Sequence, residues 1–183
     1  MDIKKKMYNR NPLLMLSYLS RNRNDKSIYG KKIADDIAAN QGSISMLLKD
    51  FRELGILNSE NIGKTIVYKV NEDNPITKSF RVFENLLEIN DLVQIIKPYS
   101  RKIILFGSCA RGEDTSISDI DLFVVADSDN QEHIREKISN YEIGRQINPV
   151  IVGTLELIEL EENDKVFIKE IYSGIQLGGG NIE

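Results

Sequence analysis

The first part of the chain changes from helical to extended spacing of its apolar residues. Asn11–Leu19 is an apolar helical run, and Tyr29–Ala39 repeats apolar residues at helical intervals. Ser43 is expected to cap a third helix. The apolar face of that helix consists of Ile44, Leu47, Leu48, Phe51 and Leu54. Beyond a turn, Thr65–Val70 alternates like a strand, so the pattern predicts three helices followed by a β-hairpin.

A longer helical pattern connects this region to the rest of the chain. Asp73-Asn74-Pro75 is a helix start, with proline in the first position. The apolar stripe that follows, at steps of 4, 3 and 4, is Ile76, Phe80, Phe83 and Leu87. Such a stripe fits a homodimer seam and fits equally well a helix that packs on the chain's own domains. Pro98 should close the next segment, Asp91–Lys97.

Two apolar strands dominate the rear part. Ile103–Phe106 reads as a buried strand, and Gly107-Ser108 turns from it into a short helix; after a polar loop, a second strand opens with two acids. Since side chains alternate along a strand, Asp119 and Asp121 should project from one face, expected to be the open face of the sheet, while Ile120 and Leu122 enter the core. A helix and a third strand with a central proline, suited to a sheet edge, then predict an α/β fold with a small mixed sheet.

Composition and charge divide the chain in the same place. Hydrophobic content of 41% and charged content of 28% are ordinary for a soluble globular protein. The net charge of −4 conceals +4 over residues 1–75 and −8 over residues 76–183, which suggests two modules with different partners. No apolar run approaches the ~20 residues of a membrane span, and the start has no secretory pattern. One cysteine, expected to be a small filler, fits a cytoplasmic protein.

The two acids and the glycine turn carry the candidate chemistry. Two carboxylates one strand period apart can hold a hard cation such as Mg²⁺, which keeps places for substrate phosphates. Gly107 permits close backbone approach, the Ser108 hydroxyl can donate, and a helix N-terminus favours anions. Two metal-binding carboxylates beside a phosphate-binding turn indicate phosphoryl or nucleotidyl transfer.

Gly107-Ser108-x-Ala110-Arg111-Gly112, followed by Ser118-Asp119-x-Asp121-Leu122, resembles the signature of the polymerase β-type nucleotidyltransferase superfamily, in its minimal branch. The resemblance implies that Asp119 and Asp121 are catalytic and hold the metals, and that Gly107 and Ser108 bind the phosphates of an NTP. Arg111 suits a triphosphate, but a salt bridge to Asp114 or Asp119 explains it equally well. Minimal members often belong to toxin–antitoxin pairs.

The third carboxylate of the superfamily pattern is missing. By its place in the third strand, Asn148 stands where the family has an aspartate that completes the metal site. An amide oxygen can coordinate a cation, but it carries no charge and cannot serve as a base. The only histidine, His133, is expected to be solvated.

The front module looks like a winged helix-turn-helix. In that reading the candidate contacts to duplex DNA, with Lys64 at the wing tip meeting phosphate, are Ser43, Ser45, Lys49, Arg52 and Lys64, together with Gly42. The alternative is an ordinary solvated basic face on a module that mediates dimerisation. A charge of +4 is modest for a tight DNA binder.

These features together predict a winged helix-turn-helix (1–72), a connecting helix (73–90), a nucleotidyltransferase domain (91–178) and a tail (179–183). The leading function is Mg²⁺-dependent transfer of a nucleoside monophosphate from an NTP to a hydroxyl on a protein, RNA or small molecule. The alternative is a DNA-binding regulator whose degenerate rear domain senses a nucleotide without transferring it. Neither function requires a membrane.

Overall fold

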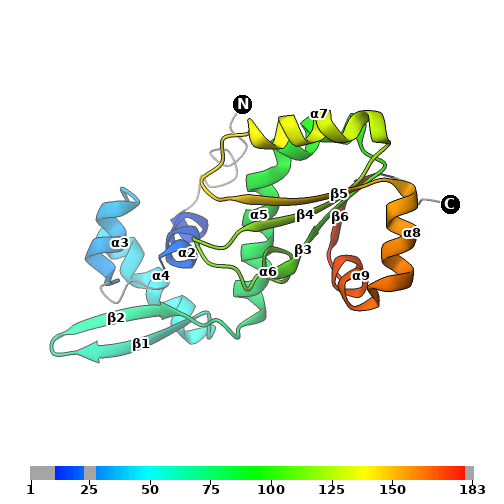
Figure 1. The fold of residues 1–183 in the computed structure, drawn as a ribbon. Coiled ribbons are helices and arrows are strands. Elements are labelled where there is room, and N and C mark those ends of the chain that lie inside the picture. Colours follow the sequence, from blue (N-terminus) through cyan, green and yellow to red (C-terminus); the bar gives the residue numbers. More distant parts are fainter. Residues whose placement is uncertain (1–10, 23–27, 180–183) are drawn as a thin grey trace. The chain divides into compact units, whose positions relative to one another are not determined.

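The computed structural model describes residues 11–22 and 28–179. The chain divides into two compact units, Met1–Glu84 and Asn85–Glu183, and the division falls inside one helix. Each unit buries apolar side chains of its own, and the helices and strands of both units are labelled in Figure 1. No helix in the described ranges is long and apolar enough to cross a membrane.

Before α5, the described residues of the front unit form three helices and a hairpin, in the order that the apolar pattern predicts. The helices are α2 (Asn11–Arg21), α3 (Gly30–Asp36) and α4 (Gln41–Glu53), and the antiparallel strands are β1 (Leu57–Ile62) and β2 (Thr65–Val70). The buried faces of α2, α3 and α4 supply most of the core, which includes Met15, Leu19, Ile33, Ile44 and Leu48. Periodicity alone therefore located these elements to within a few residues.

The cap of α4 differs from the prediction. Asn40 caps the helix, because its Oδ1 accepts the backbone N–H groups of Gly42 at 2.9 Å and Ser43 at 3.2 Å. Ser43 is therefore an exposed residue inside the first turn rather than the cap. Asparagine and serine are comparable N-caps. Because α4 already begins at Gln41, Asn40 stands at the N-cap position and Ser43 does not.

Helix α5 (Pro75–Ile96) is longer than the predicted connecting helix and joins most of the two segments expected at 73–90 and 91–97 into one helix. Asn74 Oδ1 accepts the Ile76 N–H at 2.9 Å, so the helix begins with proline in its first position, as predicted. Phe80 in the apolar stripe is buried, whereas Ile76 is exposed. The residues of α5 before Asn85 belong to the front unit and the remainder to the rear unit.

The rear unit is built on a four-stranded mixed sheet, which confirms the predicted α/β class. Its strands are β3 (Lys102–Phe106), β4 (Ile120–Val125), β5 (Ile147–Val152) and β6 (Ile175–Gly179), in the spatial order β5-β4-β3-β6. β4 and β5 are parallel and the other pairs are antiparallel. β5, which contains Pro149, is an edge strand, as expected. Gly179, predicted to start a tail, instead ends β6; residues 180–183 lie outside the described part.

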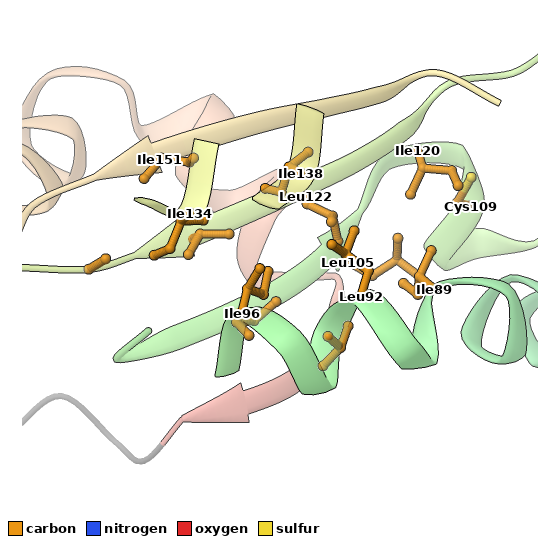
Figure 2. Close-up of a cluster of buried hydrophobic side chains, with 14 residues drawn as sticks. Ile89, Leu92, Ile96, Leu105, Cys109, Ile120, Leu122, Ile134, Ile138 and Ile151 are labelled. Carbon is orange, nitrogen blue, oxygen red and sulfur yellow. The ribbon is translucent and has the colours of Figure 1, made fainter. Parts of the chain in front are cut away.

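Helices cover both faces of this sheet. On one face, α5 and α7 (Ser128–Ser139) pack on alternate residues of β3, β4 and β5, and Figure 2 shows that Ile120, Leu122 and Cys109 belong to this cluster. On the other face, α8 (Thr154–Asn163) and α9 (Lys165–Tyr172) pack on Ile104, Phe106 and Phe123. Since Asp121 alternates with Leu122, it lies on the α8 and α9 face. The prediction that this face is open is wrong, because α8 and α9 bury Phe123 next to the acid, and Asp121 itself is half-buried at the end of the strand.

His133 is less exposed than the sequence suggests. Its ring packs edge-on against Tyr99 with the centroids 4.4 Å apart, and its Nε2 atom is buried. Helical spacing places His133 beside the core residue Ile134 but cannot show that a ring from the short helix Lys97–Tyr99 covers it.

Candidate active site

The turn from β3 into the short helix α6 (Gly107–Arg111) brings Gly107 against Asp121. Register pairs Phe106 with Asp121, so the residue after Phe106 lies beside that carboxylate. Gly107 has a φ of +69°, and a Cβ at this position would collide with Asp121 Oδ2. Only glycine can combine this backbone conformation with this approach. The turn and the second acid of the motif therefore meet, as the sequence motif implies.

Asn148 completes a row of polar side chains at this end of the sheet. β4–β5 register pairs it with Asp121, and its Nδ2 donates to Asp119 Oδ2 at 3.0 Å. Its Oδ1 accepts Gln146 Nε2 at 3.0 Å. Asn148 thus stands beside both acids, where its place in the strand predicts it, and in this hydrogen-bond arrangement it bridges them without adding charge.

The electrostatics of this row favour a cation. Burial, and then the neighbouring charge of Asp119, raise the pKa of the Asp121 carboxyl above its usual value, although a hydrogen bond from Asn148 opposes the change. Two half-buried carboxylates that repel each other are stabilised by a positive ligand between them.

The donor set fits a magnesium ion. Mg²⁺ prefers oxygen ligands and is usually held by one or two carboxylates, with water and substrate phosphates completing its shell. Asp119 and Asp121 supply two carboxylates, and the Asn148 carbonyl offers a third oxygen if its amide group turns. In the described residues no three His, Cys, Asp or Glu side chains gather into a metal site. The residues present therefore fit an ion that depends on its substrate for further ligands.

Arg111 has different partners from those the sequence suggested. Its Nε contacts Glu113 Oε2 at 2.9 Å and its Nη1 contacts Glu170 Oε1 at 3.3 Å, so a pair with Asp114 or Asp119 is wrong. All three side chains are 46–47% exposed. The Glu170 charge acts on Asp121 as well as on Arg111, which places α9 at the edge of the site.

Ser108, half-buried in the first turn of α6, completes the candidate phosphate-binding residues.

Sequence reasoning missed two residues that adjoin these groups. Glu170 belongs to α9, which lies outside both segments of the nucleotidyltransferase motif. Arg145 precedes β5, and its Nη1 contacts Asp114 Oδ2 at 2.7 Å in the partner role expected of Arg111. Only the apolar spacing of Phe167, Ile168 and Ile171 could have indicated α9, and nothing in the sequence joins Arg145 to a residue 31 positions earlier.

The predicted DNA contacts lie on exposed positions of the front unit. Ser43, Ser45, Lys49 and Arg52 are exposed on α4, and Lys64 is exposed at the hairpin turn next to Gly63. Ser45 Oγ donates to its own helix, and Lys49 Nζ lies 3.9 Å from Glu53 Oε1. The N-terminal half of α4 carries no carboxylate, whereas Asp50 and Glu53 lie near its end.

Comparison with known proteins supports the character of the rear unit. Residues 90–180 match the model of the family described as "Polymerase beta, Nucleotidyltransferase". A polymerase β-type nucleotidyltransferase domain over these residues, with nucleotidyl transfer from an NTP as its general activity, is thereby supported. No curated protein matches the chain. A crystal structure of AF1382 from Archaeoglobus fulgidus is similar at 16% identity and a TM-score of 0.41, over 48% of this chain and 94% of that chain.

Proposed function

We propose that the protein transfers a nucleoside monophosphate from an NTP to a hydroxyl acceptor, with Mg²⁺ held by Asp119 and Asp121. The observation that carries the proposal is the contact between the Gly107 turn and the Asp121 carboxylate. In this arrangement a phosphate at the turn would lie next to a cation on the two acids. When bound, Mg²⁺ would neutralise phosphate charge and orient the transferred group.

The chain's own residues would supply binding and orientation. Gly107 and Ser108 would receive the β- and γ-phosphates, and Arg111 could exchange Glu170 for a phosphate oxygen, since a guanidinium binds carboxylate and phosphate in the same way. The acceptor hydroxyl would belong to a protein, an RNA or a small molecule.

A direct experiment incubates the purified protein with each of the four NTPs, labelled at the α-phosphate, together with Mg²⁺ and cell extract. We expect label to become covalently attached to an acceptor and to remain through denaturation. The matched control is the Asp119→Ala, Asp121→Ala double variant, whose folding is checked by circular dichroism. Label that never becomes covalent in any extract would contradict transfer.

Asn148 favours a second function, in which a DNA-binding regulator senses a nucleotide without transferring it. Its amide donates to Asp119 and cannot accept a proton from an attacking hydroxyl. If transfer is slow because this base is missing, Asn148→Asp should raise the rate by up to ~10²–10⁴-fold. Nucleotide binding without transfer in both forms would favour the sensing function.

For the front unit we propose a winged helix-turn-helix that binds duplex DNA through α4 and the hairpin turn. The proposal is supported by the order of three helices and a hairpin and by the exposure of the predicted contacts. Lys49→Ala and Arg52→Ala should each flatten the salt dependence of binding by roughly one unit per lost phosphate contact. Lys165→Ala, an exposed lysine in the rear unit, is the control. Absence of binding at low salt, with a concentration-dependent mass in solution, would indicate dimerisation instead.

A further inference from the structure

A buried polar cluster lies under the candidate active site and is separate from the residues assigned to substrate. We name it the Arg145 cluster; it comprises Arg145, Asp114, Glu88, Asn85 and Cys109. Arg145 Nη1 donates to Asp114 Oδ2 at 2.7 Å, and Nη2 donates to Asn85 Oδ1 at 2.7 Å and to Glu88 Oε2 at 2.9 Å. The side chains of Arg145 and Asp114 are 8% exposed and that of Glu88 is 13% exposed.

The charges in this cluster depend on one another. Burial alone would lower the pKa of the Arg145 guanidinium, but the carboxylates of Glu88 and Asp114 hold that pKa above its ordinary value. Removing one member of such a set leaves an uncompensated charge, whereas replacing the whole set with apolar residues is often harmless to stability. A contribution to overall stability therefore explains the cluster poorly. Its contacts to neighbouring segments of the site explain it better.

The cluster connects directly to the backbone of the site. Asn85 Nδ2 donates to Asp114 Oδ1 at 2.9 Å and to the Cys109 carbonyl of α6 at 3.0 Å. Cys109 Sγ donates in turn to the Asp119 carbonyl at 3.3 Å. Burial, and then the Asp114 charge, raise the pKa of the Cys109 thiol to about 11, so the thiol keeps its proton at neutral pH.

The third connection is through β5. Arg145 lies three positions before Asn148, and the carbonyl of the intervening Gln146 accepts the Ile120 N–H at 2.9 Å. The guanidinium therefore fixes the start of β5 against both the loop of Asp114 and helix α6. These are the segments that carry Asn148, Asp119 and the Gly107 turn.

We propose that Arg145 is a positioning residue for the candidate nucleotidyltransferase site. Through Asp114, Asn85 and Cys109 it holds α6 and the Asp119 backbone at fixed places relative to β5. Its effect on substrate rests on the proposed function, but its effect on the site's backbone does not. Residues that orient metal ligands typically change metal affinity or activity by roughly 10–100-fold when they are substituted.

The first test measures amide hydrogen exchange of the full chain in wild type and in Arg145→Lys, at a temperature where circular dichroism shows both folded. Lysine keeps the charge but loses the fork that bridges two partners. We expect faster exchange in residues 107–121 and unchanged exchange in α7. Unchanged exchange in 107–121, or a uniform increase over the rear unit, would overturn the proposal.

A milder pair of variants keeps the test informative if Arg145→Lys fails to fold. Cys109→Ser preserves a donor to the Asp119 carbonyl, and Cys109→Ala removes that donor with a similar loss of volume. Exchange of residues 119–121 should rise in the alanine variant and stay near wild type in the serine variant. Equal exchange in the two variants would overturn the connection between the cluster and Asp119.

Nucleotide binding separates this inference from the proposed function. With Mg²⁺ and whichever of the four NTPs wild type binds most tightly, Arg145→Lys should bind about 10–100-fold more weakly while it is folded. A lower melting temperature with an unchanged Kd would make Arg145 merely structural and contradict the inference. A wild type that binds no NTP would contradict the proposed function, while the exchange result would still decide the positioning role.

Discussion

Two arginines flank the candidate active site, and their surroundings differ more than their chemistry. Arg111 is 47% exposed and contacts Glu113 and Glu170, which are equally open to water. Arg145 is 8% exposed and contacts Asp114, Glu88 and Asn85, all largely or fully buried. An ion pair in water forms and breaks at little cost, whereas a buried one loses several kcal/mol when a partner is removed. Exposure to water therefore suits Arg111 to exchange its carboxylate partners for a substrate, whereas burial suits Arg145 to hold the surrounding segments in place.

The largest expected difference in stability is between variants that lose one or the other guanidinium. Arg145→Met should lower the free energy of unfolding by about 3–5 kcal/mol, because Asp114 and Glu88 remain buried without their cation. Arg111→Met should lower it by less than about 1 kcal/mol. Urea unfolding of both variants checks the difference. Similar losses in the two variants would remove the distinction between scaffold and exchangeable pair.

A second substitution tests the Gly107 turn, which lies against Asp121. Gly107→Ala should lower stability by roughly 1–2 kcal/mol for the left-handed backbone, and its Cβ should push the Asp121 carboxylate out of its present position. Gly63→Ala is the matched control, with a φ of +61° and no atom within 4 Å of the added Cβ. Only Gly107→Ala should also lose Mg²⁺-dependent NTP binding in a binding titration. Loss of binding in both variants, or in neither, would disconnect the turn from the nucleotide.

A smaller effect is expected where Arg111 is held by Glu170. Glu170→Gln removes both a competitor for the guanidinium and a negative charge near Asp121, so NTP should bind a few-fold more tightly in calorimetry. Glu161→Gln is the control, since Glu161 accepts from Tyr172 on the same pair of helices. Weaker binding in Glu170→Gln would instead make Glu170 a ligand or a base of the site.

The smallest effect concerns stability and pH. Because burial and Asp119 raise the folded-state pKa of Asp121, ionising this carboxyl destabilises the fold. This penalty is absent below the ordinary pKa of 3.8 and is fully present once the pH exceeds the folded pKa. In metal-free buffer Asp121→Asn should therefore melt slightly higher than wild type at pH 7, and the difference should shrink toward pH 4. A lower melting temperature at pH 7 would contradict this account of the acids.

The sequence predicted the parts of the molecule that local spacing determines. The period of apolar residues located α2, α4 and the β1–β2 hairpin. Alternation separated Asp121 from the core face of Ile120 and Leu122 but could not show that α8 and α9 cover the opposite face. The family resemblance placed Asn148 on a strand next to the acids, and the β4–β5 register, which pairs Asn148 with Asp121, agrees with that placement.

Long-range partners were beyond the same reasoning. Arg111 and Arg145 look alike in the sequence, and only the fold shows which one Asp114 contacts. The contribution of α9 to the site depends on β6 pairing with β3, a strand about 70 residues earlier. These long-range contacts depend on tertiary packing, which the periodicity of side chains along the sequence does not reveal.

The most direct test of the central claim, that Asp119, Asp121 and the Gly107 turn hold an NTP through Mg²⁺, is a calorimetric titration of wild type and Asp121→Asn. Each is titrated with the four NTPs in Mg²⁺ and again with the cation chelated. The account predicts that wild type binds at least one NTP only with Mg²⁺, and that Asp121→Asn binds none while it melts no lower than wild type. NTP binding that survives chelation or the loss of the Asp121 charge would contradict it.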